Sequence, residues 1–313
     1  MAPRSVTPAP SAATSAAALA FAPAADAEAG EAFTRDLAHS HYENFSVVSR
    51  LLPSDLRQDF CNVYAFCRLA DDLADEAAAA PVALRNLERF RQGLRDCYAG
   101  NPGSAVFQAL GRTVMRCDIP IDPFLDLIDA FEQDQQVTRY ETFADVVEYC
   151  RRSANPVGRL VLYVCGYRDA QRQRLSDFTC TALQLANFWQ DVRRDLRDLD
   201  RIYVPRASMQ QFGVSEDDLR RERAGENVRR MIRFEVDRTE AMFAQGDALL
   251  PLLAPRVRRQ VALFGAGGRA VLHAIRRQDY DTLVRRPVLS RWQKGRLALR
   301  LVACELRGRL AGR

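Results

Sequence analysis

The sequence predicts an all-α fold, built as a single domain. Apolar residues recur with the 3.6-residue period of a helix along most of the chain, whereas the period-2 alternation typical of strands is hard to find. No linker divides the 313-residue chain after residue 31, and a hydrophobic content of 48% with 27% charged residues suits one sizeable core.

A series of helices is expected, separated by prolines, glycines and polar turns, because proline removes a backbone donor and glycine favours turns. The breaks fall at Pro53, Pro81, residues 100–103, Pro120, residues 155–156, Pro205, Gly213, Pro251, residues 265–268 and Pro287. The expected helices span residues 31–41, 55–76, 81–98, 103–117, 121–135, 142–153, 156–167, 171–199, 215–247, 251–264, 267–284 and 290–310. Ser54 and Asp169 suit the starts of the helices over 55–76 and 171–199, since short polar side chains accept hydrogen bonds from the first free amides.

The two ends of the chain differ from the rest in composition. Residues 1–30 are mostly Ala, Pro, Ser and Thr, which predicts a disordered tail. Residues 31–287 are expected to form the main folded domain. Residues 288–313 are expected to form a basic amphipathic helix, which could lie on an anionic membrane surface or remain a solvated basic tail. Its basic residues are Arg291, Lys294, Arg296, Arg300, Arg307, Arg309 and Arg313.

Charge and cysteine content argue against several classes of protein. The net charge of +5 is mild, and no matching motif is present, so no nucleic-acid partner is expected. The eight cysteines include no Cys-x-x-Cys pair, which favours reduced, buried thiols in a cytoplasmic protein. No apolar run of about 18 residues predicts a transmembrane helix. The expected location is the cytoplasm, with peripheral attachment to the inner membrane as an open alternative.

Two pairs of aspartates carry the strongest chemical signal. Asp71 and Asp75 are four residues apart, as are Asp191 and Asp195, so each pair places two carboxylates on one face of a predicted helix. Like charges at this spacing repel, and carboxylates that face a core are costly without a cation. Mg²⁺ prefers oxygen ligands and usually joins one or two carboxylates to substrate phosphates. The pairs therefore predict Mg²⁺ sites beside a diphosphate, provided that their two helices face each other.

A solvated helix face is the alternative interpretation of both pairs. Asp72 and Glu76 form a second acidic pair in the same turn as the first, as expected on an exposed face. Near the second pair the acids alternate with Arg193, Arg194 and Arg197, which would equally suit surface ion pairs.

Six blocks of sequence, taken in order, resemble those of the squalene/phytoene synthase family. They are residues 64–75, 139–143, 149–158, 183–195, 201–205 and 283–287. The resemblance runs from about His39 to about Pro287 and includes both aspartate pairs.

The resemblance implies that residues 31–287 form a catalytic domain with the isoprenoid-synthase fold, a helical bundle around a central apolar cavity. In it the four aspartates would hold Mg²⁺, with three ions per site. Six further residues are implied in the site, namely Tyr64, Arg68, Tyr149, Asn187, Arg201 and Arg286. The arginines would pair with phosphate oxygens, for which the guanidinium fork is suited. The tyrosines would bond to the diphosphate or steer a carbocation, and the asparagine would complete a metal shell.

Within the family, the chain most resembles bacterial hydroxysqualene synthases of hopanoid pathways, in residues 41–45, 153–158 and 187–191. This implies ionisation of presqualene diphosphate and capture of the cation by water to give hydroxysqualene, without NADPH. Asn155 and Gln190 are candidates for positioning the water, because the chain departs there from related synthases. Condensation of two prenyl diphosphates to presqualene diphosphate, squalene or phytoene is the alternative. A non-catalytic binding or assembly protein of the same fold is the third interpretation.

Overall fold

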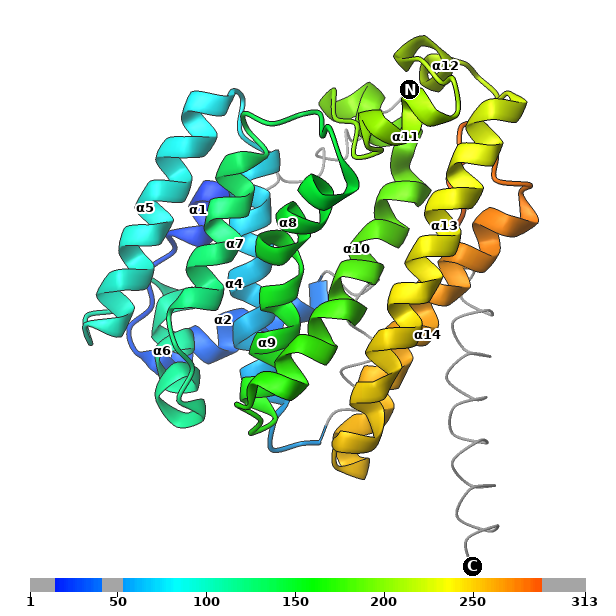
Figure 1. The fold of residues 1–313 in the computed structure, drawn as a ribbon. Coiled ribbons are helices and arrows are strands. Elements are labelled where there is room, and N and C mark those ends of the chain that lie inside the picture. The colour runs from blue at the N-terminus through cyan, green and yellow to red at the C-terminus, as the bar shows by residue number, and fades with distance from the viewer. Residues whose placement is uncertain (1–14, 41–52, 289–313) are drawn as a thin grey trace, which may run out of the picture.

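The computed structural model describes residues 15–40 and 53–288. These residues are mostly helical, and the only strand-like pairing among them is an isolated parallel bridge between Arg139 and Ile202 (Figure 1). The all-α fold predicted from the sequence is confirmed. The helices are α1 (Ala16–Ala20), α2 (Ala27–Ser40), α4 (Arg57–Asp75), α5 (Ala80–Tyr98), α6 (Ala105–Cys117), α7 (Asp122–Gln133), α8 (Phe143–Ser153), α9 (Asn155–Val164), α10 (Ala170–Leu199), α11 (Arg206–Gln211), α12 (Glu216–Arg220), α13 (Glu226–Gly246), the 3₁₀ helix η1 (Asp247–Leu252) and α14 (Pro255–Arg277).

Helices α4 to α10 begin and end within a few residues of their predicted positions. Asp169 caps α10 as predicted, because its Oδ1 accepts a hydrogen bond from the Arg172 amide at 3.0 Å. Ser54 does not cap α4. That helix is preceded by Leu56, and no side chain accepts from its first amides. None of the described helices is long and apolar enough to cross a membrane.

The prediction of a disordered tail over residues 1–30 is wrong for residues 15–30. Helix α1 and the first residues of α2 lie there, and Ala20 is fully buried. Alanine favours helix formation, and its small side chain lets the short α1 pack against α4. Gly30 lets α2 approach α6 closely, since a Cβ at that position would lie 2.5 Å from the Ala105 carbonyl oxygen. Residues 1–14 lie outside the described part of the chain.

Two predicted boundaries in the C-terminal half are also wrong. Residues 265–268, expected to break the chain, lie inside the continuous helix α14. Gly268 instead permits close packing, because a Cβ there would lie 2.3 Å from the Phe243 ring. Conversely, the helix predicted over 215–247 is divided into α12 and α13. The helix predicted over 290–310 lies outside the described residues.

Two clusters of buried side chains form the core. The first includes Phe66 of α4 and Phe90 of α5, together with apolar residues of α6, α7 and α9. The second includes Trp189 of α10 and Phe243 of α13, together with residues of α8 and the C-terminal part of α14. In Figure 1, α4 and its neighbours form one group of helices, and α10, α13 and α14 form another. The two acidic segments therefore belong to different parts of the core.

Candidate active site

The first acidic pair lies at the C-terminal end of α4. The Asp71 side chain keeps 44% of its surface exposed, and its carboxylate lies 3.7 Å from the Arg68 guanidinium. Asp72, by contrast, is buried and accepts a hydrogen bond from Arg68 Nε at 2.9 Å. The expectation that Asp72 belongs to a solvated face is therefore wrong. Asp72 fixes the arginine that lies beside the first pair.

The positive charge near Asp71 is too small to keep the pKa of its carboxylate at the ordinary value. Partial burial of the carboxylate raises the pKa of Asp71 to about 7, and repulsion from Asp75 also raises it. Arg68 acts in the opposite direction but does not restore the ordinary value. An additional cation near the first pair would therefore stabilise its ionised form.

The second acidic pair, on α10, is neutralised unevenly. Only 3% of the Asp191 side chain is exposed, and both of its oxygens pair with Arg286, with Nη2 at 2.9 Å from Oδ2. Asp195 is half-buried, and within the described ranges no ion pair reaches its carboxylate. Burial raises the pKa of Asp195 to about 7, and repulsion from Asp191 adds to the effect. Within this pair, a protein side chain balances the charge of Asp191, whereas no ion pair among the described residues balances that of Asp195.

Arg201 connects the two pairs. Helix α10 ends at Leu199, and the next residue, Asp200, turns the chain with a φ of 49°. The Ile202 amide then donates to the Thr138 carbonyl at 2.9 Å. This path places Arg201 in the interior, where Nη1 lies 3.7 Å from Asp75 Oδ1. The same guanidinium lowers the pKa of Asp195. Arg201 therefore pairs with an acid of α4 and acts electrostatically on an acid of α10.

Asp134, which follows α7, is a site residue that the sequence did not reveal. It is buried, and its Oδ2 accepts a hydrogen bond from the Tyr149 hydroxyl at 2.6 Å and lies 3.7 Å from Arg201 Nη1. Its carbonyl also accepts from Arg201 Nη2 at 3.0 Å. Burial raises the pKa of Asp134 to about 6, although Arg201 lowers it. Asp134 thus holds Arg201 and Tyr149 in place together.

Aromatic rings surround this buried carboxylate. Tyr203 stacks on Phe188 with ring centroids 3.7 Å apart, and the Tyr203 hydroxyl lies 3.5 Å from Asp134 Oδ1. The Tyr149 ring lies 5.7 Å from that of Tyr203. Burial raises the pKa of Tyr149 well above its usual range, so its hydroxyl remains a proton donor. The predicted site residue Tyr149 is therefore linked to Arg201 through Asp134.

Two other predicted site residues lie on the acidic helices themselves. Tyr64 is half-buried one turn before Arg68, and burial raises its pKa. Asn187 is exposed one turn before Asp191, so it shares the face of α10 that carries Asp191 and Asp195. Both positions agree with the predicted site, but the roles of these residues stay predictions.

Asn155 and Gln190, the candidates for positioning water, both have protein partners. Asn155 Oδ1 accepts from the Thr181 hydroxyl at 2.9 Å, which joins α9 to α10. Gln190 is buried, and its Nε2 donates to the Pro287 carbonyl. Gln190 therefore ties α10 to the chain beside Arg286, a structural contact that the sequence did not predict.

The side chains around the two pairs fit a hard divalent cation. All four predicted metal ligands are carboxylates, and Asp71 and Asp195 both have raised pKa values that a cation would lower. Among the described residues, no group of three or more acidic, histidine or cysteine side chains is arranged so that it could hold a metal ion by itself. Mg²⁺ needs no such group, because it keeps several waters and takes other ligands from substrate phosphates.

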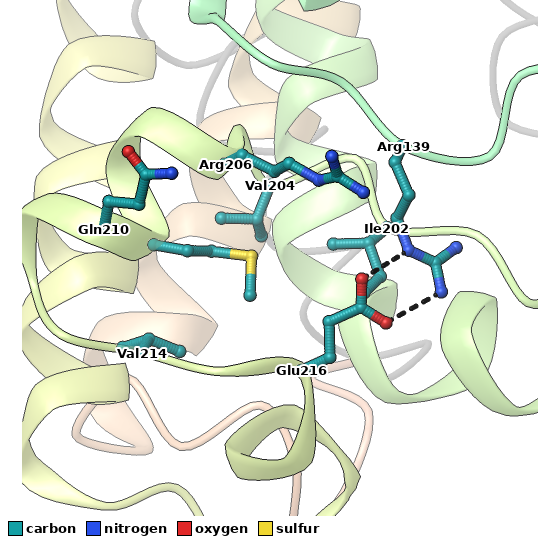
Figure 2. Close-up of a pocket in the computed structure, with 8 residues that line it drawn as sticks. Arg139, Ile202, Val204, Arg206, Gln210, Val214 and Glu216 are labelled. Atoms are coloured by element: carbon teal, nitrogen blue, oxygen red, sulfur yellow. Dashed lines mark hydrogen bonds and ion pairs between the residues drawn. The ribbon is translucent and has the colours of Figure 1, made fainter.

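Two surface pockets lie apart from the acidic pairs. The first, of about 140 Å³, is lined by apolar residues such as Val204 and Val214 and by the ion pair of Arg139 with Glu216 (Figure 2). The second, of about 330 Å³, is lined in part by Tyr140 and Tyr149. Neither includes an aspartate of the two pairs, so the central apolar cavity stays a prediction.

Comparisons with known proteins point to one family. The sequence profile of squalene/phytoene synthase matches residues 38–293. The chain is 31% identical to the phytoene synthase of Thermus thermophilus over 261 residues, which cover 82% of this chain and 87% of the relative. It is 36% identical to the hydroxysqualene synthase of Zymomonas mobilis over 204 residues, or 64% of this chain and 67% of the relative.

Solved structures agree with these sequence relatives. The squalene synthase HpnC from Alicyclobacillus acidocaldarius is 50% identical, with a TM-score of 0.77 over 81% of this chain and 95% of that one. A dehydrosqualene synthase solved with a ligand has a TM-score of 0.82 at 24% identity, over 90% of this chain and 98% of that one. At that lower identity the likeness concerns the fold alone.

Proposed function

The chain belongs to the squalene/phytoene synthase family, and from this premise we propose that it converts presqualene diphosphate to hydroxysqualene and diphosphate. The bond between the substrate carbon and the diphosphate oxygen breaks, and its electron pair leaves with the diphosphate. The resulting carbocation rearranges and bonds to the oxygen of water, which releases a proton. The observation that carries the proposal is a single buried arginine, Arg201, which lies 3.7 Å from Asp75 of the first pair and lowers the pKa of Asp195 in the second pair.

The protein's own residues hold the diphosphate and its charge. Arg68 and Arg286 lie at the edges of the first and second acidic pairs, where partly exposed guanidinium groups can donate to phosphate oxygens. Arg201, held by Asp134 and 3.7 Å from Asp75, supplies a third cation beside the first pair. Tyr149 keeps its proton, and its buried ring packs beside that of Tyr203, in a group of aromatic side chains whose faces can stabilise positive charge.

Mg²⁺ would be held by Asp71, Asp75, Asp191 and Asp195, with Asn187 as a neutral oxygen ligand. When bound, it supplies the positive charge that makes diphosphate a good leaving group. Without it, the ionised pairs repel one another and an anionic substrate. The proposed reaction consumes no reductant, so no NADPH is required.

Condensation of two prenyl diphosphates is the second candidate function. The 31% identity to a phytoene synthase over 82% of this chain favours it. The more local 36% identity to a hydroxysqualene synthase supports the first candidate. A non-catalytic binding protein would have no need for two acidic pairs around a buried arginine.

Purified protein incubated with Mg²⁺ and one substrate at a time distinguishes these functions. The proposal expects hydroxysqualene and diphosphate from presqualene diphosphate, and no product from farnesyl diphosphate. A product from farnesyl diphosphate alone would establish condensation instead. No diphosphate release from any prenyl substrate would favour the non-catalytic protein. Asp71→Ala should abolish turnover while the far-ultraviolet circular dichroism stays unchanged.

Peripheral membrane contact is proposed for the basic C-terminal segment, whose residues 289–313 lie outside the described part. Such a contact would suit a lipid-like substrate and product, because basic amphipathic helices bind anionic lipid surfaces. Truncation after Pro287 should reduce pelleting with anionic liposomes at low salt. Unchanged pelleting would leave a solvated basic tail as the better account.

A further inference from the structure

We propose that Arg286 neutralises Asp191 in the metal-free protein and that a metal ion must displace it. Metal binding at the second acidic pair then depends on diphosphate, which gives Arg286 another partner. This inference rests on the proposed function for the identity of the metal and of the anion. It adds an order of events and a coupling between two ligands, both of which can be measured without following the reaction.

The ion pair with Arg286 occupies both oxygens of the Asp191 carboxylate. Arg286 Nε donates to one carboxylate oxygen, and Nη2 donates to the other at 2.9 Å. Only 3% of the Asp191 side chain is exposed, which leaves little room for another ligand. Direct coordination of a metal by Asp191 therefore requires the guanidinium to move.

The backbone around Arg286 is anchored to α10, so the movement can be confined to the side chain. Arg193 Nη1 donates to the Leu283 carbonyl at 2.7 Å, and Gln190 Nε2 donates to the Pro287 carbonyl. These two bonds come from residues on either side of Asp191 in sequence. They hold the segment before and after Arg286 against the helix that carries the acid.

Arg286 is placed so that it can change partners. Its side chain is 43% exposed, whereas Asp191 is buried, so the cation lies on the outer side of the pair. A guanidinium binds phosphate oxygens in the same two-pronged manner as a carboxylate. An arriving diphosphate therefore offers Arg286 an equivalent partner and leaves Asp191 available to the metal.

The exchange makes the two ligands cooperative. Metal without diphosphate must compete with Arg286 for a buried carboxylate, whereas metal with diphosphate need not. Linkage requires that each ligand strengthens the binding of the other by the same factor. Asp71 and Asp195, which lack such a close two-pronged partner, are not subject to this competition.

Equilibrium dialysis of Mn²⁺, used as a detectable substitute for Mg²⁺, tests the inference on the full chain. In the wild type, saturating inorganic diphosphate should strengthen Mn²⁺ binding about tenfold, as is typical of coupled sites. Arg286→Gln should bind Mn²⁺ alone more tightly than the wild type, and the added effect of diphosphate should shrink. Arg285→Gln removes the same charge one residue earlier, where the side chain contacts Gln278, and should leave both quantities unchanged.

The outcomes separate this inference from the proposed function. If wild type binds Mn²⁺ with diphosphate but Arg286→Gln binds Mn²⁺ alone no more tightly, the exchange is refuted and the metal site stands. If no protein binds Mn²⁺ even with diphosphate, the metal assignment fails and the exchange with it. Should Arg286→Gln not fold, Arg286→Lys decides, because it keeps the charge but loses the two-pronged contact. Tighter binding of Mn²⁺ alone by Arg286→Lys supports the exchange, and equal binding overturns it.

Discussion

Replacing Asp195 with asparagine should stabilise the metal-free protein at pH 8, while it removes activity. The Asp195 carboxylate is half-buried one turn from Asp191, and its raised pKa means that the folded protein holds the proton more tightly than the unfolded chain does. Asparagine keeps the shape of the protonated acid without its capacity to ionise. The variant therefore avoids a cost that the wild type bears whenever the acid is charged.

The size of this cost follows from the pKa. The pKa rises from 3.8 to about 7, and each pH unit corresponds to about 1.4 kcal/mol, which gives about 4 kcal/mol for full burial. Partial contact of Asp195 with solvent screens roughly half of that, leaving about 2 kcal/mol. Below pH 3.8 the carboxyl is protonated in both states and costs nothing. The cost grows between pH 4 and pH 7 and is complete above pH 7.

Urea unfolding in the presence of a chelator at pH 4, 6 and 8 measures this difference. The unfolding free energies of wild type and Asp195→Asn should coincide at pH 4 and diverge as the pH rises. Asp198→Asn is the control, because Asp198 is exposed and paired with Arg197 at 2.7 Å, so its removal should not stabilise the protein at any pH. Equal stabilities of wild type and Asp195→Asn at pH 8 would refute the claim that this acid lacks a sufficient counter-charge.

Three further expectations concern packing, metal binding and catalysis. Gly268→Ala, which places a Cβ 2.3 Å from the Phe243 ring, should lower the unfolding free energy by about 1–3 kcal/mol. In the same denaturation assay, Gly267→Ala, which meets nothing within 4 Å, should raise it by about 0.5–1 kcal/mol. The half-saturating Mg²⁺ concentration should rise as the pH falls below about 7, by about tenfold per pH unit for each proton displaced, because Asp71 must lose its proton to bind a metal; a flat profile would contradict its role as a ligand. Asp134→Asn should lower kcat for diphosphate release about a hundredfold with a circular dichroism spectrum like that of the wild type, and an unchanged kcat would argue against its positioning role.

The positions of the helices could be predicted wherever the local sequence determines them. From α4 to α10, each helix carries its own apolar periodicity and is followed by a proline, glycine or polar turn, so its position follows from the sequence. The helix predictions are wrong where contacts with a distant part of the chain determine the local structure. Gly268 continues a helix because Phe243 packs against the space that a side chain would need. The alanines of α1 are helical because they pack against α4, a contact that low-complexity sequence does not reveal.

The same distinction applies to the candidate site. The spacing of the aspartates predicts which carboxylates share a helix face, because that relation is local. The spacing of residues along the chain does not predict which side chains from other helices will contact them. Asp134 lies in a run of polar residues at the end of α7, without periodicity or motif, and only the fold brings Tyr149 and Arg201 to it. Burial of Asp72 and the contact of Gln190 with Pro287 were missed for the same reason. Metal binding by the four aspartates stays a prediction.

The division of the core into two clusters gives the site a mechanical consequence. The first cluster includes α4 and the second includes α10, and Arg201 pairs with an acid of α4 while it lowers the pKa of Asp195 on α10. A ligand that binds both acidic pairs would therefore connect a helix of one cluster to a helix of the other. Its departure would remove that connection while both clusters of buried side chains stay packed, since local opening costs less than global unfolding. Product release and loosening of the molecule would then be a single event.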